Sequence, residues 1–179
     1  MTQPTQPVGK YQPPTSGPTA KLVMRATVPE GDLYGVFMLD DAERCGGHRM
    51  VGTGDTKRNP LTTTVAANRL QTLEFRLIKP SKQVCAVRWS FTPLAGKSYL
   101  LRAGTQTGGC VALVMDMSNP EQIKLEPTAL RRNPGTSSCM PLSQSKGVTA
   151  AEADAGKGGQ DAVLREGAGT EDLQGLMGR

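Results

Sequence analysis

Three consecutive strand-like runs occupy residues 84–117, and they constrain the fold more than any other part of the chain. In the first run, 84–92, successive side chains point to opposite faces, so that the only tryptophan, Trp89, shares a face with a cysteine, a valine and a phenylalanine. Pro- and Gly-containing turns separate this run from the next two, 97–103 and 110–117. This spacing predicts a β-meander with one buried face.

Strand-like runs continue through the rest of the central region, separated by turn residues about every ten positions. The further predicted strands are 21–28, 33–39, 49–53, 61–67, 69–79 and a short one at 123–125. We expect the first two to pair as a hairpin. Seven to nine short strands predict an all-β fold, an antiparallel β-sandwich of immunoglobulin-like or transthyretin-like type, with a small barrel as the alternative. Trp89 follows Cys85 by only four positions, which disfavours an immunoglobulin domain proper.

Composition divides the chain into three parts. Only 37% of the residues are hydrophobic and 4% aromatic, and most of this apolar material lies in 20–142, the predicted sandwich domain. Residues 1–19 are rich in Pro, Thr and Gln and predict a flexible N-terminal tether. Residues 143–179 are rich in Gly and Ala and predict a flexible C-terminal tail.

The net charge is +5, and its distribution is uneven. Residues 145–179 contain four basic and six acidic residues, so the remainder carries +7. A basic body favours anionic partners, but there is no dense Lys/Arg run, which indicates charges spread over an ordinary surface. The large aromatic residues fall on the apolar sides of their strands, so we expect no specific nucleic-acid binding.

The four cysteines are Cys45, Cys85, Cys110 and Cys139, and none forms a C-x-x-C pair. Two disulfides are therefore expected, with four free thiols in a cytosolic protein as the alternative. If the meander strands are neighbours, Cys85 and Cys110 lie two strand spacings apart, about 9.6 Å, which exceeds disulfide reach. We expect Cys45–Cys85 with Cys110–Cys139; Cys45–Cys110 with Cys85–Cys139 stays open.

The candidate chemical groups are few. The only histidine, His48, follows Cys45 in a Gly-Gly segment and is interpreted as a surface-loop residue rather than a catalytic base. A Cys₃His zinc site would lack paired ligands around the other cysteines. Asp40, Asp41 and Glu43 form an acidic turn without the pattern of a calcium loop. We therefore expect no catalytic, cofactor-binding or metal-binding residues, and expect the cysteines to be structural.

A polar Pro/Thr/Gln tail followed by an all-β body, in which Cys85 precedes the run Trp-Ser-Phe-Thr-Pro-Leu-Ala-Gly-Lys-Ser-Tyr, resembles the mature part of small Gram-negative envelope lipoproteins. The resemblance covers residues 2–141. It implies a flexible tether and a lipid anchor, although residue 1 is Met and there is no lipobox cysteine.

No apolar run is long enough for a transmembrane helix, and no signal peptide is visible, so any anchor is expected on a removed segment. We therefore expect a non-enzymatic periplasmic or outer-membrane accessory subunit with a protein partner in the envelope. An intracellular or virion-associated structural domain with free cysteines is the alternative, and a hydrolytic or metal-dependent enzyme comes third.

Overall fold

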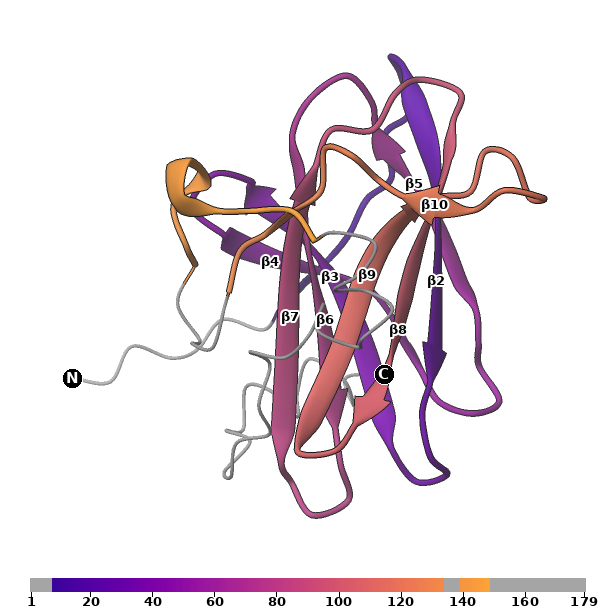
Figure 1. Ribbon diagram of the computed structural model, residues 1–179, viewed down its shortest axis with the longest axis vertical. Coiled ribbons are helices and arrows are strands. Elements are labelled where there is room, and N and C mark those ends of the chain that lie inside the picture. The colour runs from indigo at the N-terminus through magenta and orange to yellow at the C-terminus, as the bar shows by residue number, and fades with distance from the viewer. Residues whose placement is uncertain (1–7, 134–138, 149–179) are drawn as a thin grey trace.

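The computed structural model describes residues 8–133 and 139–148, and it is built almost entirely of β-strands (Figure 1). The eight longer strands are β2 (Thr19–Thr27), β3 (Leu33–Asp41), β4 (Gly46–Gly54), β5 (Leu61–Ala66), β6 (Gln71–Ile78), β7 (Val84–Phe91), β8 (Ser98–Gln106) and β9 (Gly109–Asp116). Three two-residue strands, β1 (Gly9–Lys10), β10 (Lys124–Leu125) and β11 (Leu130–Arg131), and the 3-10 turn η1 (Leu142–Gln144) complete the described elements.

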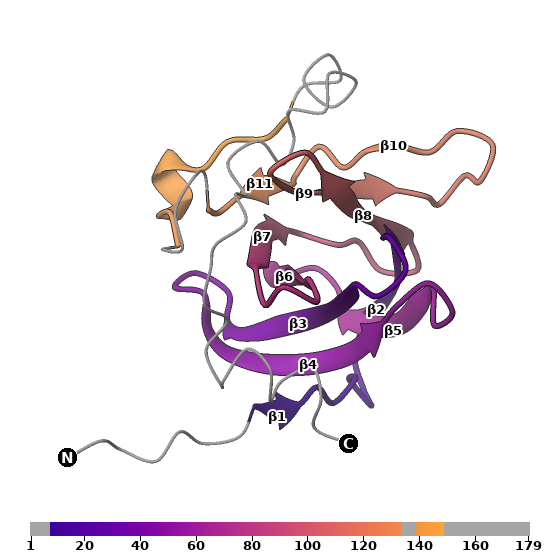
Figure 2. The same ribbon diagram turned by 90° about the horizontal axis from the view of Figure 1, so that it is seen from below.

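The strands form two sheets that pack face to face (Figure 2). We call them sheet A, with the order β1-β4-β3-β6-β7-β11, and sheet B, with the order β10-β9-β8-β2-β5. Most neighbours are antiparallel, while β1 with β4 and β2 with β8 are parallel. The predicted all-β sandwich is therefore confirmed, with mixed rather than purely antiparallel sheets.

The inner faces of both sheets supply a single main core. Alternation places Leu22 and Met24 of β2 against Phe75 and Trp89 of sheet A, all of them buried. The indole Nε1 of Trp89 donates a hydrogen bond to the carbonyl of Ala112 in β9, 2.8 Å away. This bond satisfies the one polar group of the largest core side chain.

The predicted strands are largely correct, but two predicted pairings are wrong. The run predicted as the first meander strand, β7, pairs with β6 along its whole length, whereas β8 and β9 belong to sheet B. The chain therefore crosses between the sheets after β7. Likewise β2 and β3 do not form a hairpin, because β2 lies in sheet B and β3 in sheet A. In both cases a turn that looks like a hairpin connects the two layers.

The predicted disulfide connectivity is also wrong, for the same reason. Cys85 bonds to Cys110, with Cα atoms 6.1 Å apart, and Cys45 bonds to Cys139, with Cα atoms 5.9 Å apart. β7 and β9 face each other across the two sheets and do not sit two spacings apart in one sheet. The bond that the meander disfavoured is thus the one that closes this side of the sandwich.

Replacing both Cys85 and Cys110 with Ala should lower the free energy of unfolding by about 3 kcal/mol, because the bond closes a 25-residue separation in the unfolded chain. Urea unfolding followed by the fluorescence of buried Trp89 measures this change. Peptide mapping of the variant should still show Cys45–Cys139. An unchanged unfolding midpoint with an unchanged slope would contradict the expectation.

The described ends of the chain both contact the sandwich. Tyr11, just after β1, donates its backbone N–H to Met50 of β4 and its hydroxyl to the carbonyl of Thr64 in β5. These bonds link the two sheets on the side opposite Cys85–Cys110. Near the other end, Arg131 donates its N–H to the carbonyl of Lys146. The rest of the predicted tether, 1–7, and the tail beyond residue 148 lie outside the described residues.

Candidate functional site

The outer face of sheet A holds a second, smaller apolar cluster. β3 is apolar on both faces, so Phe37 and Leu39 point away from the main core and are nevertheless buried. They pack with Ile78 and with the Cys45–Cys139 disulfide. Met50 and Val84 flank the cluster and are partly buried. This outward layer is the setting for the most concentrated charged groups in the described structure.

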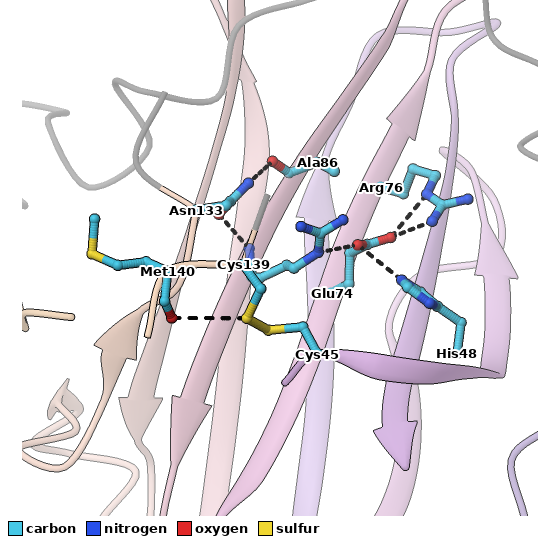
Figure 3. Close-up of polar contacts among 9 residues, drawn as sticks. Cys45, His48, Glu74, Arg76, Ala86, Asn133, Cys139 and Met140 are labelled. Carbon is cyan, nitrogen blue, oxygen red and sulfur yellow. Dashed lines mark hydrogen bonds and ion pairs between the residues drawn. A yellow bond between two sulfur atoms is a disulfide. The ribbon is translucent and has the colours of Figure 1, made fainter. Parts of the chain in front are cut away.

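Glu74 lies at the centre of these charges, and its side chain is completely buried (Figure 3). One carboxylate oxygen lies 3.1 Å from His48 Nε2 and also accepts from Arg88 Nε, while the other accepts two N–H groups of Arg76. The register explains the meeting, because Glu74 is opposite Arg88 on β7 and opposite Phe37 on β3. Adjacent strands thus place one anion among three basic side chains.

The aromatic ring of Phe37 packs against two of the basic side chains on the outer face of sheet A. The guanidinium carbon of Arg76 lies 4.6 Å from the ring centroid, in cation–π geometry. His48 meets the same ring edge-on, with centroids 5.8 Å apart. Both basic side chains are therefore fixed by a ring on one side and by Glu74 on the other.

The pKa of Glu74 reflects two opposed effects. Burial alone would raise it, but the hydrogen bond from His48 and the charges of Arg76 and Arg88 lower it from the usual 4.5 to about 2. Glu74 is consequently ionised at neutral pH and is a weak proton acceptor there. The arrangement is suited to holding charges in place.

The free energy of unfolding should therefore decrease as the pH falls through the acid range. The lowered pKa means that Glu74 contributes fully to stability above the unfolded-state value near 4.5 and loses this contribution as pH falls toward about 2. Over that window the free energy of unfolding should decrease by about 3 kcal/mol through this one group. Urea unfolding at a series of pH values measures it. A Glu74→Gln variant, which cannot titrate at this position, should give a correspondingly flatter profile.

Two residues beyond β11 extend the polar network along β7. The side chain of Asn133 accepts the N–H of Arg88 at 2.8 Å and donates to the carbonyl of Ala86 at 2.6 Å, so it replaces a neighbouring strand at this edge. Arg132 is completely buried and donates to the carbonyls of Ala42, Glu43 and Met140 and to Ser90 Oγ. Arg132 and the Cys45–Cys139 disulfide therefore fasten the same segment to the β3–β4 turn.

The interpretation of His48 as a surface-loop residue is wrong. His48 belongs to β4, and its side chain is 27% exposed and bound to Glu74. Asp40 and Asp41, the acidic turn, pair with Arg49 and Arg44 respectively. Among residues 8–133 and 139–148, no three His, Cys, Asp or Glu side chains are grouped as a metal ion would require.

The central residue of the site, Glu74, was missed because strict alternation placed it on a solvent-facing side. The signal that could have revealed its burial is the nearly continuous apolar run of β3, Leu33–Asp41. A strand that is apolar on both faces is covered on both faces. A charged side chain on the neighbouring strand that points to the same covered face is then expected to be buried and to need an oppositely charged partner.

Comparison with protein-family models, with curated proteins and with solved structures finds no match to this chain. Within the part of the chain that the structure describes, no helix has the length and apolar character needed to cross a membrane. All four cysteines are paired. Two disulfides indicate an oxidising, exported compartment.

Proposed function

We propose that this chain is a non-enzymatic binding or accessory subunit of the bacterial cell envelope, located in the periplasm or at the outer membrane. The observation that carries the proposal is the pairing of all four cysteines in two disulfides that fasten the sandwich at separate places. Disulfides of this kind persist in the periplasm and are reduced in the cytosol. The intracellular alternative with free cysteines lacks this support.

A binding role is favoured over catalysis by the state of the reactive side chains. The single histidine contacts a carboxylate whose pKa is about 2, and the cysteines are oxidised. A rigid sandwich with its ionisable groups committed to one another is suited to presenting a surface. The lipoprotein character, with a tether at residues 1–19, rests on the resemblance of the sequence to envelope lipoproteins.

A face or a loop is favoured over strand addition as the binding surface. Of the four edge strands in the described sheets, β1, β10 and β11 have two residues each. The longer edge, β5, already uses the carbonyls of Thr64 and Ala66 to accept bonds from Tyr11 and Gln71. The strands behind the short ones are engaged as well: the Ala112 and Val114 carbonyls of β9 accept from Trp89 and Glu126, and the Asn133 side chain bonds to Ala86 and Arg88 of β7. Occupied backbone groups are not open to an incoming strand.

The location is tested by isolating the chain from cell fractions and alkylating it under denaturing, non-reducing conditions. We expect recovery from the envelope fraction, no alkylated thiols, and peptides joined as Cys45–Cys139 and Cys85–Cys110. Recovery from the cytosol with four alkylated thiols would refute export.

The binding role is tested in the same cells by photo-cross-linking from exposed positions on each face of the sandwich. A discrete protein adduct from one face is expected. No adduct from any face would refute a partner-binding role.

A further inference from the structure

Two arginines stand side by side on the outer face of sheet B. Leu22, Met24 and Leu101 point into the core, so alternation turns Arg25 of β2 and Arg102 of β8 outward, and both are exposed. They are direct partners in the parallel register, which sets their backbones about 4.8 Å apart. Like charges in such positions destabilise a sheet. Neither forms an ion pair with any residue within 8–133 or 139–148.

The loop after β4 brings two more basic residues beside them. The side chain of Asn59 bonds to both the N–H and the carbonyl of Ala26, the neighbour of Arg25, and so fixes the loop against β2. Lys57 and Arg58 precede it and are exposed. The acidic residue of this loop, Asp55, accepts the backbone N–H groups of both and is used by the turn itself. The two basic residues outnumber the one carboxylate, which leaves the loop with a net charge of +1, so this end of sheet B is positive.

A largely apolar groove of about 540 Å³ lies beside Arg102. Arg102 forms part of its lining, together with Val28, Val111, Leu113 and Thr27. Gly104 also lines it, and a side chain is excluded at this position because a Cβ would lie 2.9 Å from the Thr27 carbonyl oxygen. The face thus combines a place for an apolar side chain with a place for carboxylates.

We propose that this face, formed by β2, β8 and β9, binds an acidic peptide segment of a partner protein. Carboxylates of the segment contact Arg25 and Arg102, and an apolar side chain enters the groove beside Gly104. Charge complementarity selects an acidic partner, and the apolar lining selects a peptide over a polysaccharide, which has no apolar side chain to place there. The inference rests on the proposed role as a binding subunit and names the chemistry of its partner.

The test uses the full chain, labelled with ¹⁵N, and three short synthetic peptides. The probe alternates glutamate with leucine; the controls alternate glutamate with serine and lysine with leucine. We expect the Glu–Leu peptide to shift amide resonances of β2, β8 and β9 and to bind about tenfold more tightly than either control. Binding should weaken as salt is raised, since exposed charges carry part of it.

Variants connect the binding to the two arginines. Arg25→Glu with Arg102→Glu should weaken the Glu–Leu peptide at least about tenfold. Lys10→Glu with Arg69→Glu makes the same change in net charge at exposed positions off this face, and should leave the affinity nearly unchanged. Urea unfolding followed by Trp89 fluorescence verifies that both variants are folded.

The proposal is overturned if no Glu–Leu binding is detected at millimolar peptide, if the Glu–Ser peptide binds equally well, or if the shifted amides lie in sheet A. Stronger binding of dextran sulfate or of phosphatidylglycerol vesicles, lost in the Arg25/Arg102 variant, would assign the face to a polyanion or a membrane instead. A partner cross-linked in cells only from sheet A would leave the binding role standing and remove this surface. Peptide binding at this face without any adduct in cells would support the surface as a peptide site and refute the partner-binding role in the cell.

Discussion

Replacing Glu74 with Gln is expected to lower the free energy of unfolding at neutral pH by about 3 to 5 kcal/mol. The carboxylate is fully buried and is contacted by Arg76, Arg88 and His48. The amide has nearly the same shape but carries no charge, and its N–H₂ group faces donors instead of acceptors. The positive side chains keep most of their desolvation cost and lose the attraction of the Glu74 carboxylate. Urea unfolding followed by Trp89 fluorescence gives the difference.

Glu121→Gln is the matched control, because Glu121 is exposed in the turn before β10 and has no ion pair within the described residues. Its effect should stay within about 0.5 kcal/mol. Adding Arg88→Met to Glu74→Gln should cost less than the sum of the two separate changes, because each change by itself already removes the Glu74–Arg88 ion pair. A Glu74→Gln protein as stable as the parent would show that the cluster contributes nothing to folding.

Alternation in the sequence predicted well which side of a strand faces the core, since side-chain direction follows directly from a period of two. The face predicted for Trp89, which it shares with a cysteine, a valine and a phenylalanine, is the face that the core uses. The predicted 61–67 and 69–79 runs correspond to β5 and β6 with small shifts at their ends. These assignments depend only on local pattern, which one sequence contains.

Strand partners could not be read in the same way. Alternation says which side of a strand is buried, and it is equally satisfied whether the next strand continues the same sheet or crosses to the facing one. The turn after Phe91 contains Pro93 and Gly96, as a hairpin turn would, yet it connects β7 of sheet A to β8 of sheet B. The error in disulfide pairing followed from assuming that β7, β8 and β9 share one sheet. The expected separation of Cys85 and Cys110 was two strand spacings within that sheet, whereas the two residues lie in different sheets.

The charged site was out of reach for a related reason. Glu74 and Arg76 have the outward positions of an ordinary half-exposed strand, and nothing in their own run indicates that they are covered. Their partners come from positions 26 residues earlier, at His48, and 14 residues later, at Arg88. Only the register of four adjacent strands brings these side chains together, and register is a property of the folded sheet.

Arg132 shows the same limit for a residue outside any strand, and it leads to the second large expected effect. No local sequence pattern marks it as buried, yet it is completely buried and donates to three carbonyls and to Ser90 Oγ. Arg132→Met keeps the length of the side chain and removes every donor. The buried Ser90 Oγ and the partly buried carbonyls of Glu43 and Met140 then lose their Arg132 hydrogen bonds, at about 1 to 3 kcal/mol for each group that water does not reach.

We expect Arg132→Met to lower the free energy of unfolding by about 3 to 4 kcal/mol, somewhat less than the summed loss, because burial of the guanidinium charge, which lowers the Arg132 pKa, is relieved at the same time. Arg69→Met, at an exposed position, should change it by no more than about 0.5 kcal/mol. Hydrogen exchange adds a local reading: opening should become easier at the β3–β4 turn and in residues 139–148, while the β6 and β7 amides that pair with each other keep their protection. Equal loss of protection throughout both sheets would mean that Arg132 supports the whole sandwich instead of fastening this segment to it.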